Sequence, residues 1–246
     1  PVLSKIDFLD EKTENISFNP KNNDEFFYLK GQVMFKRHLE NKENTEQTFL
    51  NNLVTFKATE DDIIWLSTSG FLFKTNYFGQ TIEALNRKPF SIQKEKKYKI
   101  EIQNSKLFLL ENNDLYYLSA EGDLEKIMEG IQGIKFSPDS QKVVYWNDHE
   151  IWILGFEPEY KKVFLTRFSK KIGDCFWLTP YYLIFNVEKE IKISEIDDRD
   201  KLNIINLSNE NLIKNEENLK IFYNQLNKKL YVLNQEILFF SEPIIP

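Results

Sequence analysis

An internal repeat of about 41 residues is the feature that most constrains the fold of this chain. The stretch ISFNPKNNDEFFYLKGQVMF, residues 16–35, aligns with IKFSPDSQKVVYWNDHEIWI, residues 134–153. In both, an alternating strand ends in Phe-x-Pro and is followed by a polar turn, an apolar run, a second turn and another strand. A unit of this kind cannot bury its apolar face alone and must stack on further copies.

Four more segments follow the middle and last parts of this pattern, at residues 63–74, 107–118, 183–194 and 230–240. The third residue of each apolar run serves as a marker, which gives Tyr28, Trp65, Leu109, Tyr145, Phe185 and Val232. The steps between markers are 37, 44, 36, 40 and 47 residues, which average about 41. This period is typical of a four-stranded propeller blade and too long for a leucine-rich repeat.

Residue types within the repeats favour strands over helices. The runs are short, rich in β-branched and aromatic residues, and bounded by Asn, Asp, Ser and Gly, as in strands and hairpins. The second strand of a repeat is continuously apolar, at residues 26–29, 63–66 and 143–146, as expected for a strand covered on both faces. More polar outer strands are expected at residues 45–50, 81–85, 124–128, 161–167 and 202–207.

The repeats therefore predict an all-β, six-bladed β-propeller of four-stranded antiparallel blades, as one domain over residues 1–246. The expected blades cover residues 15–52, 53–92, 97–129, 131–169, 172–207 and 218–246. The sixth repeat supplies three strands, whereas residues 1–10 belong to no repeat. We expect this N-terminal segment to be the outer strand of the last blade and to pair near residues 237–240, because closure removes open sheet edges.

Composition excludes several other classes. Cys175 is the single cysteine and the chain has 8 glycines, which excludes a disulfide scaffold and a paired-cysteine zinc site. The net charge of -6 is the wrong sign for a nucleic-acid-binding domain. Apolar runs reach only about five residues, far below the roughly 18 that cross a bilayer. The chain begins with Pro1, so an excised segment with a missing upstream part is expected.

The segment FSPDSQKVVYWNDHEIWIL, residues 136–154, resembles the TolB-like and WD-repeat-like propeller class, whose repeats carry a Phe-Ser-Pro-Asp turn before an apolar strand. Residues 165–204 are similar to propellers of uncharacterised membrane-anchored proteins of candidate bacterial phyla, which often follow a PEGA domain. This resemblance implies an upstream anchor, a PEGA module and an extracytoplasmic location. The chain departs from the Phe-Ser-Pro-Asp pattern at Asn19 and Lys21 and at Leu178 and Thr179.

Residues that could carry catalysis are few. The histidines are His38 and His149, without H-E-x-x-H spacing, and no G-x-S-x-G elbow occurs. Cys175 precedes Phe176 and Trp177, which favours an inert core thiol over a nucleophile. The acidic run of residues 195–200 could suggest calcium, but it lacks EF-hand spacing and fits an exposed hairpin turn.

Aromatic and basic residues offer two further candidates. Trp65, Trp146, Trp152 and Trp177 could form a sugar- or peptide-binding platform, although most are expected to pack between blades. The basic clusters at residues 94–97 and 170–171 are short and are interpreted as solvated loops.

The sequence thus favours a non-enzymatic binding or scaffold domain, expected to be monomeric, that uses one ring face to hold a protein or glycan. It identifies no catalytic, cofactor-binding or metal-binding residue. The alternatives are a hydrolase or lyase with its site in the central channel, and a structural spacer.

Overall fold

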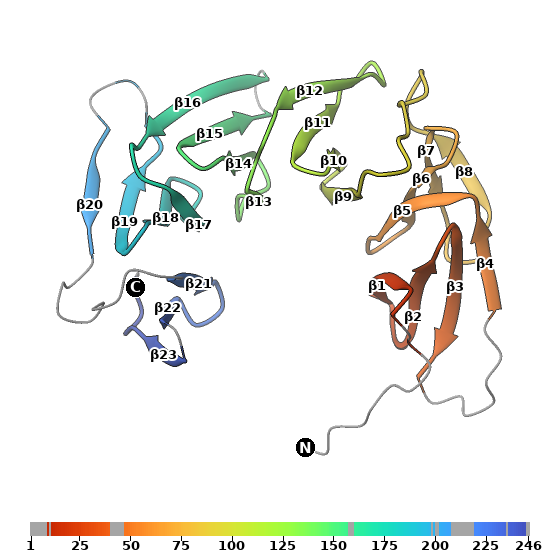
Figure 1. Cartoon of the computed structure of the whole chain (residues 1–246), viewed down its shortest axis with the longest axis horizontal. Helices are drawn as coiled ribbons and strands as arrows, with labels where there is room; N and C mark the ends of the chain where they lie inside the picture. Colours follow the sequence, from red (N-terminus) through yellow and green to blue (C-terminus); the bar gives the residue numbers. More distant parts are fainter. Residues whose placement is uncertain are drawn as a thin grey trace. The chain divides into compact units, whose positions relative to one another are not determined.

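The computed structural model describes residues 9, 11–39, 47–156, 160–197, 199, 202–207, 219–234 and 236–244. In this part of the chain, β-strands joined by turns and loops form six sheets, and no helix occurs (Figure 1). Every sheet consists of strands consecutive in sequence and paired antiparallel, which confirms the predicted all-β class. No described segment is a helix long and apolar enough to span a bilayer. The chain divides into two compact units, residues 1–129 and 130–246, which are described separately.

The first unit contains three four-stranded sheets. Sheet A consists of β1 (Thr13–Asn19), β2 (Asn22–Lys30), β3 (Val33–His38) and β4 (Gln47–Asn51). Sheet B consists of β5 (Leu53–Ala58), β6 (Ile63–Ser67), β7 (Leu72–Thr75) and β8 (Thr81–Ala84). Sheet C consists of β9 (Tyr98–Gln103), β10 (Lys106–Glu111), β11 (Asp114–Leu118) and β12 (Leu124–Met128).

The second unit contains two four-stranded sheets and one of three described strands. Sheet D consists of β13 (Gly133–Phe136), β14 (Lys142–Trp146), β15 (Glu150–Gly155) and β16 (Lys161–Arg167). Sheet E consists of β17 (Ile172–Thr179), β18 (Tyr182–Val187), β19 (Glu190–Glu195) and β20 (Ile204–Asn206). Sheet F consists of β21 (Lys220–Asn224), β22 (Lys229–Asn234) and β23 (Ile237–Phe240).

The second strand of each sheet carries the apolar run that defined the repeat. All five residues of β6 are buried, and Tyr28, Tyr145 and Phe185 have no exposed surface. Outer strands lie close to the predicted ranges, although β20 is shorter than expected. The expected closing strand falls on residues 1–10, of which all but residue 9 lie outside the described part, so it stays a prediction.

Neighbouring sheets within each unit bury their facing side chains in continuous cores. Phe27, Leu29 and Met34 of sheet A pack against Phe56 and Ile63 of sheet B. Comparable cores lie between sheets B and C, D and E, and E and F. The paired sheets therefore hold each other by the hydrophobic effect, which is the main stabilising contribution here.

A side-chain-capped turn explains the Phe-x-Pro signature of the repeat. In Phe-Ser-Pro-Asp, Ser137 Oγ accepts from the Lys142 amide at 3.0 Å and donates to Asp139 Oδ1 at 2.5 Å. In the first repeat Asn19 replaces the serine, and its Oδ1 accepts from the Lys21 amide at 2.9 Å. Thr179 caps its turn in the same way. Short polar side chains that accept a hydrogen bond from a nearby backbone amide stabilise such turns.

Two glycines of the second unit make room for larger neighbouring groups. A Cβ at Gly133 would lie 2.4 Å from the Trp146 ring, and one at Gly173 would lie 2.5 Å from the Asn186 amide. Trp146 Nε1 also donates to the Gly173 carbonyl at 2.8 Å. Within sheet D the Trp146 ring, and within sheet E the Asn186 amide, therefore occupy the space that a side chain at these glycines would fill.

Gly133→Ala should destabilise the protein by about 1–3 kcal/mol, because the added methyl group overpacks the Trp146 ring. Gly155→Ala is the matched control, since the nearest atom to its added Cβ is 3.9 Å away. Urea unfolding followed by circular dichroism measures both variants. Equal stability of the two would contradict the packing argument.

Candidate binding site

A groove of about 670 Å³ lies between sheets B and C of the first unit. Its lining comes from strands of both sheets, from the β5–β6 turn at residues 59–62, and from residues 104 and 105 of the β9–β10 turn. The volume falls in the range of small-molecule and peptide sites, about 300–1,000 Å³. We refer to this feature as the B/C groove.

Sheet B presents one cross-strand row to the groove. The row contains one residue from each strand in register: Lys57, Ile64, Lys74 and Glu83. Directly opposed residues on neighbouring strands point to the same face of a sheet. Since neighbouring strands are about 4.8 Å apart, the row is about 14 Å long.

Sheet C presents an apolar wall to the same groove. Ile102 and Leu107 are cross-strand partners, and Leu118 ends β11. Ile64 and Leu107 also belong to the core between the two sheets, with 4% and 2% of their surfaces exposed. The B/C groove is therefore the open end of this core, where the facing row of sheet B becomes charged.

The β5–β6 turn forms a fixed rim of the groove. The Thr59 amide donates to the Asp62 carbonyl at 2.8 Å, and Thr59 Oγ1 accepts from the Asp62 amide at 3.2 Å. The Tyr77 hydroxyl donates to the Thr59 carbonyl. Burial, followed by the nearby carboxylates of Asp62, Glu25 and Asp61, raises the pKa of Tyr77 to about 12. The phenol therefore stays protonated and keeps donating, in a negatively charged environment.

The charges that line the groove are only partly compensated. Lys74 Nζ lies 3.2 Å from Asp62 Oδ2, and Lys57 Nζ lies 3.7 Å from Glu101 Oε2. Glu60 of the turn and Glu83 of β8 are exposed and form no ion pair with any described residue. The lining thus contains two carboxylates that have no cationic partner in the described part of the chain.

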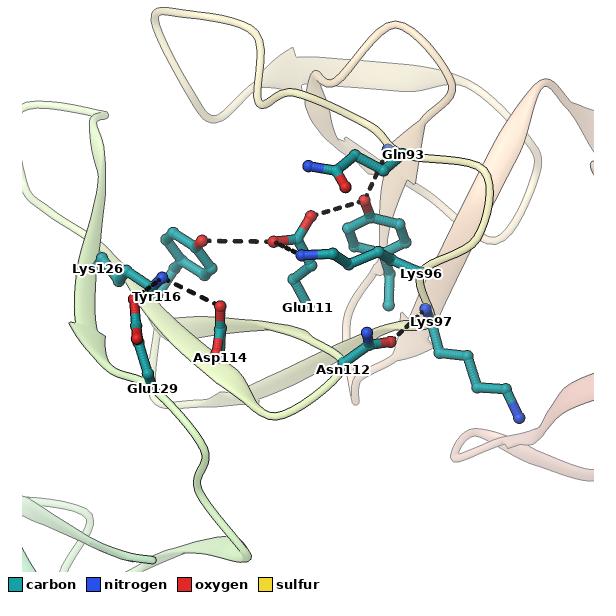
Figure 2. A network of polar contacts seen from close by, with 10 residues as sticks. Gln93, Lys96, Lys97, Glu111, Asn112, Asp114, Tyr116, Lys126 and Glu129 are labelled. Atoms are coloured by element: carbon teal, nitrogen blue, oxygen red, sulfur yellow. Dashed lines mark hydrogen bonds and ion pairs between the residues drawn. The ribbon is translucent and has the colours of Figure 1, made fainter.

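A second polar arrangement surrounds the buried Glu111 where β10 ends (Figure 2). Its carboxylate accepts from the Tyr98 hydroxyl at 2.9 Å and from Lys96 Nζ at 3.1 Å, and the Tyr116 hydroxyl lies 3.5 Å away. Burial, more than the contact with Glu111, raises the pKa of Tyr98. All these partners belong to sheet C or to the loop that precedes it, so the network anchors that loop and offers no open reactive group.

Backbone hydrogen bonds fix the same loop. The Lys97 amide donates to Asn112 Oδ1 at 2.9 Å (Figure 2). The Asn112 amide donates to the Lys97 carbonyl at 2.7 Å. Sheet E repeats the backbone bond, from the Glu188 amide to the Lys171 carbonyl at 3.0 Å. In both sheets the turn after the second strand therefore holds the segment that leads into the first strand.

The interpretation of the basic clusters as solvated loops is confirmed for the exposed Lys94, Lys97, Lys170 and Lys171 and is wrong for Lys96. Lys96 has 29% of its side-chain surface exposed and pairs with Glu111, whose side chain is 6% exposed. Lys170 and Lys171 pair with Glu188 and Asp148, at 2.7 and 3.1 Å. The carboxylate partners lie 15 and more residues away along the chain, so local charge patterning did not reveal them.

The sequence-derived candidates for catalysis do not line the groove. Cys175 is fully buried in the core between sheets D and E, and burial raises the pKa of its thiol far above the usual range. His149 is an exposed residue of the β14–β15 turn, and its amide donates to Asn147 Oδ1. His38 ends β3, with Nε2 3.6 Å from the buried carboxylate of Glu25. No group of three His, Cys, Asp or Glu residues suited to a metal ion occurs among the described residues.

The acidic run of residues 195–200 lies between β19 and β20, as the turn prediction expected, although residues 198 and 200 are outside the described part. Arg199 donates to both carboxylate oxygens of Asp197. These hydrogen bonds lower the pKa of Asp197 to about 2. Glu195 Oε1 accepts from the Asn203 amide at 3.0 Å. The described acids of this run therefore have partners within the turn.

Three of the four tryptophans pack between sheets, as predicted. Trp65 belongs to the core between sheets A and B, while Trp146 and Trp177 belong to that between D and E. Trp177 Nε1 donates to the Lys135 carbonyl of the neighbouring sheet at 2.9 Å. Trp152 is half-buried, with its ring against Phe164 and Lys162. Trp65 belongs to the first unit and the other three tryptophans to the second.

Sequence reasoning missed the B/C groove. The local signal was the acidic turn Glu60, Asp61 and Asp62 beside an alternating strand that contains Lys57. This signal alone does not identify a site, because the apolar wall comes from sheet C, more than 40 residues further along the chain.

Comparisons with known proteins show the fold and no family. No family model and no curated protein matches the chain. Among solved structures, Hsv2 of Kluyveromyces lactis is similar with a TM-score of 0.60 and 11% identity, over 96% of this chain and 74% of that one. Hsv2 of Kluyveromyces marxianus has a TM-score of 0.59 and 10% identity, over 96% and 74%.

The β-propeller domain of Swd1 (Cps50) from Myceliophteria thermophila has a TM-score of 0.52 and 12% identity, over 93% of this chain and 83% of that one. These similar structures are WD40-type β-propellers. They support a WD-repeat-like propeller fold for this chain, and at such identities they carry no ligand or activity with them.

Glu111→Leu should destabilise the protein by about 2–3 kcal/mol, because it leaves Lys96 and the Tyr98 hydroxyl without their shared acceptor. Lys97→Gln is the control, since the bonds of Lys97 to Asn112 come from its backbone. Thermal and urea unfolding measure both. If Glu111→Leu is as stable as Lys97→Gln, the network does not stabilise the loop.

Proposed function

We propose that this chain is a non-catalytic binding module that holds a short extended peptide segment in the B/C groove. The observation that carries the proposal is the pairing of an apolar wall, Ile102, Leu107 and Leu118, with a charged row on the facing sheet. A ligand that satisfies both walls needs apolar groups on one side and polar groups on the other. An extended peptide has this character, because successive side chains point to opposite sides.

The dimensions of the groove support a peptide. A row of about 14 Å accommodates about four residues of extended chain at about 3.3 Å each. Both walls belong to sheets whose facing side chains are buried in a shared core. Binding therefore requires little ordering of the protein, which favours affinity for a short ligand.

The chemistry of the lining favours binding over the alternative of hydrolysis or elimination. Among the described residues, the lining contains no histidine or cysteine, and two of its four carboxylates pair with lysines. Covalent catalysis needs a nucleophile within hydrogen-bond reach of a base. No described observation favours an enzyme, and the lined groove favours a binding module over a structural spacer.

Ring closure is a further part of this proposal. Among the described residues, β23 pairs only with β22, so its outer edge is open to a strand. Phe222 and Phe240 of sheet F are 54% and 67% exposed, and Phe18 of sheet A is 51% exposed. We infer that six blades close into one monomeric ring in which residues 1–10 add to β23 and these apolar surfaces become covered.

We also propose an extracytoplasmic location for this chain. The resemblance of residues 165–204 to propellers that follow PEGA domains supports an extracytoplasmic position behind an upstream membrane anchor. Recognition of a protein partner through an exposed peptide segment suits such a position.

The variant Lys57→Trp tests whether peptides bind in the B/C groove. Lys57 lines it, whereas Lys99 does not, and both pair with Glu101. Peptides selected from a random phage library on the native protein should bind Lys57→Trp more than about tenfold more weakly by fluorescence anisotropy. Lys99→Trp, the matched control, should bind them as the native protein does. Failure to select any peptide, or equal binding by Lys57→Trp, would overturn the proposal.

Deletion of residues 1–10 tests closure. The melting temperature should fall by more than about 5 °C, since an open edge and apolar surface become exposed to water. A synthetic peptide of residues 1–10 should restore it, while a scrambled peptide should not. An unchanged melting temperature after deletion would exclude the closing role.

A further inference from the structure

The charges of the B/C groove indicate which peptides it accepts, and this inference rests on the proposed function. The lining includes the lysines Lys57 and Lys74 and the acids Glu60, Asp61, Asp62 and Glu83. Acids exceed bases, so the groove is negative overall. A ligand with the opposite charge is favoured both in its approach and in its bound state.

Both lysines of the groove are already neutralised by described neighbours. Lys74 pairs with Asp62 at 3.2 Å, and Lys57 lies 3.7 Å from Glu101. Lys21, between β1 and β2 of sheet A, pairs with Asp61 of the groove lining at 3.1 Å. Each of these three lysines thus has a carboxylate partner, which leaves little positive charge to attract an anionic ligand.

Glu60 and Glu83 are the two lining carboxylates that have no ion-pair partner among the described residues. Glu83 ends the cross-strand row beside Lys74, whose ammonium group is directed to Asp62. Glu60 lies on the rim, in the turn that Tyr77 holds through the Thr59 carbonyl. Neither carboxylate pairs with a cation in the described part of the chain. The two therefore mark the positions where a ligand can add positive charge.

The form of the ligand follows from the two walls. In an extended segment, every second side chain faces Ile102, Leu107 and Leu118, while the others face Glu60 and Glu83. Metal ions are poor candidates, because no described group of three His, Cys, Asp or Glu residues is suited to hold one. An organic cation on a flexible stem fits better, because a lysine or arginine side chain buries its methylenes along apolar surface.

We propose that the B/C groove binds extended peptide segments in which apolar residues alternate with lysine or arginine, and that Glu60 and Glu83 select the basic residues. Exposed carboxylate–ammonium pairs each contribute about 0.2–1 kcal/mol. Two pairs therefore amount to a selectivity of up to about thirtyfold. Apolar contact with sheet C accounts for the remaining affinity.

The experiment uses three fluorescein-labelled heptapeptides in which valine alternates with lysine, with glutamine or with glutamate. The lysine peptide should bind the native protein about tenfold more tightly than the glutamine peptide, and the glutamate peptide most weakly, by fluorescence anisotropy. The preference should shrink at high salt, because exposed ion pairs are screened. The double variant Glu60→Gln/Glu83→Gln should bind the lysine and glutamine peptides equally.

Glu14→Gln/Glu121→Gln is the matched control. It removes the same charge at two exposed residues outside the groove lining, so it should keep the preference for lysine. A loss of preference in this control would show that overall charge, rather than the groove, attracts the peptide, and would overturn the inference.

The remaining outcomes separate this inference from the proposed function. Equal binding of all three peptides that Lys57→Trp abolishes would overturn the selection of basic residues but support a peptide groove. Tighter binding of the glutamate peptide would overturn the selection as well. Binding that Lys57→Trp leaves intact would overturn both proposals, because the peptides then bind elsewhere.

Discussion

The packing of one sheet against the next is the interaction on which the rest of this structure depends. A four-stranded antiparallel sheet of about 40 residues cannot bury enough apolar surface alone. The second strand of each sheet therefore carries apolar residues on both faces, and Leu66, Tyr145 and Phe185 are fully buried there. Each sheet in this chain is therefore stabilised by packing against its neighbour and would not be stable as an isolated sheet.

Polar groups enter this packing only where they are satisfied. Trp146 and Trp177 each place a bulky ring between sheets D and E and still donate to a backbone carbonyl of the neighbouring sheet. Asn186, 2% exposed, accepts from the Asp174 amide and donates to the Glu188 and Leu219 carbonyls. An unsatisfied polar group at such positions would cost about 1–3 kcal/mol, so these contacts also fix how the neighbouring sheets pack.

The B/C groove arises where this packing stops. Sheet C continues its apolar row to Leu118, whereas the facing row of sheet B places Lys57 and Lys74 beside Ile64. Charged side chains cannot complete a dry core, because removing a charge from water is costly. The lysines that end the apolar core at this point also line the groove. They give it a charged wall opposite the apolar wall of sheet C.

Residue patterns determined much of the fold in this case. The apolar runs at residues 26–29, 63–66 and 143–146 predicted the second strands because a strand covered on both faces has no polar alternation. The Phe-Ser-Pro-Asp turn was equally local, since Ser137 and Asp139 bond within the turn. Lys96 was misinterpreted because its partner Glu111 ends a strand 15 residues further along the chain.

The sequence by itself thus determined strand identity, turn positions and the all-β class, since each depends on neighbours a few residues apart. It also placed Cys175 and Trp177 in a core, because they lie on an apolar strand. Only the tertiary structure decided which lysines are paired and where a groove opens. The groove depends on sheets B and C meeting across more than 40 residues of chain, and the pairs of Lys96 and Lys170 depend on partners 15 or more residues away, which no local pattern records.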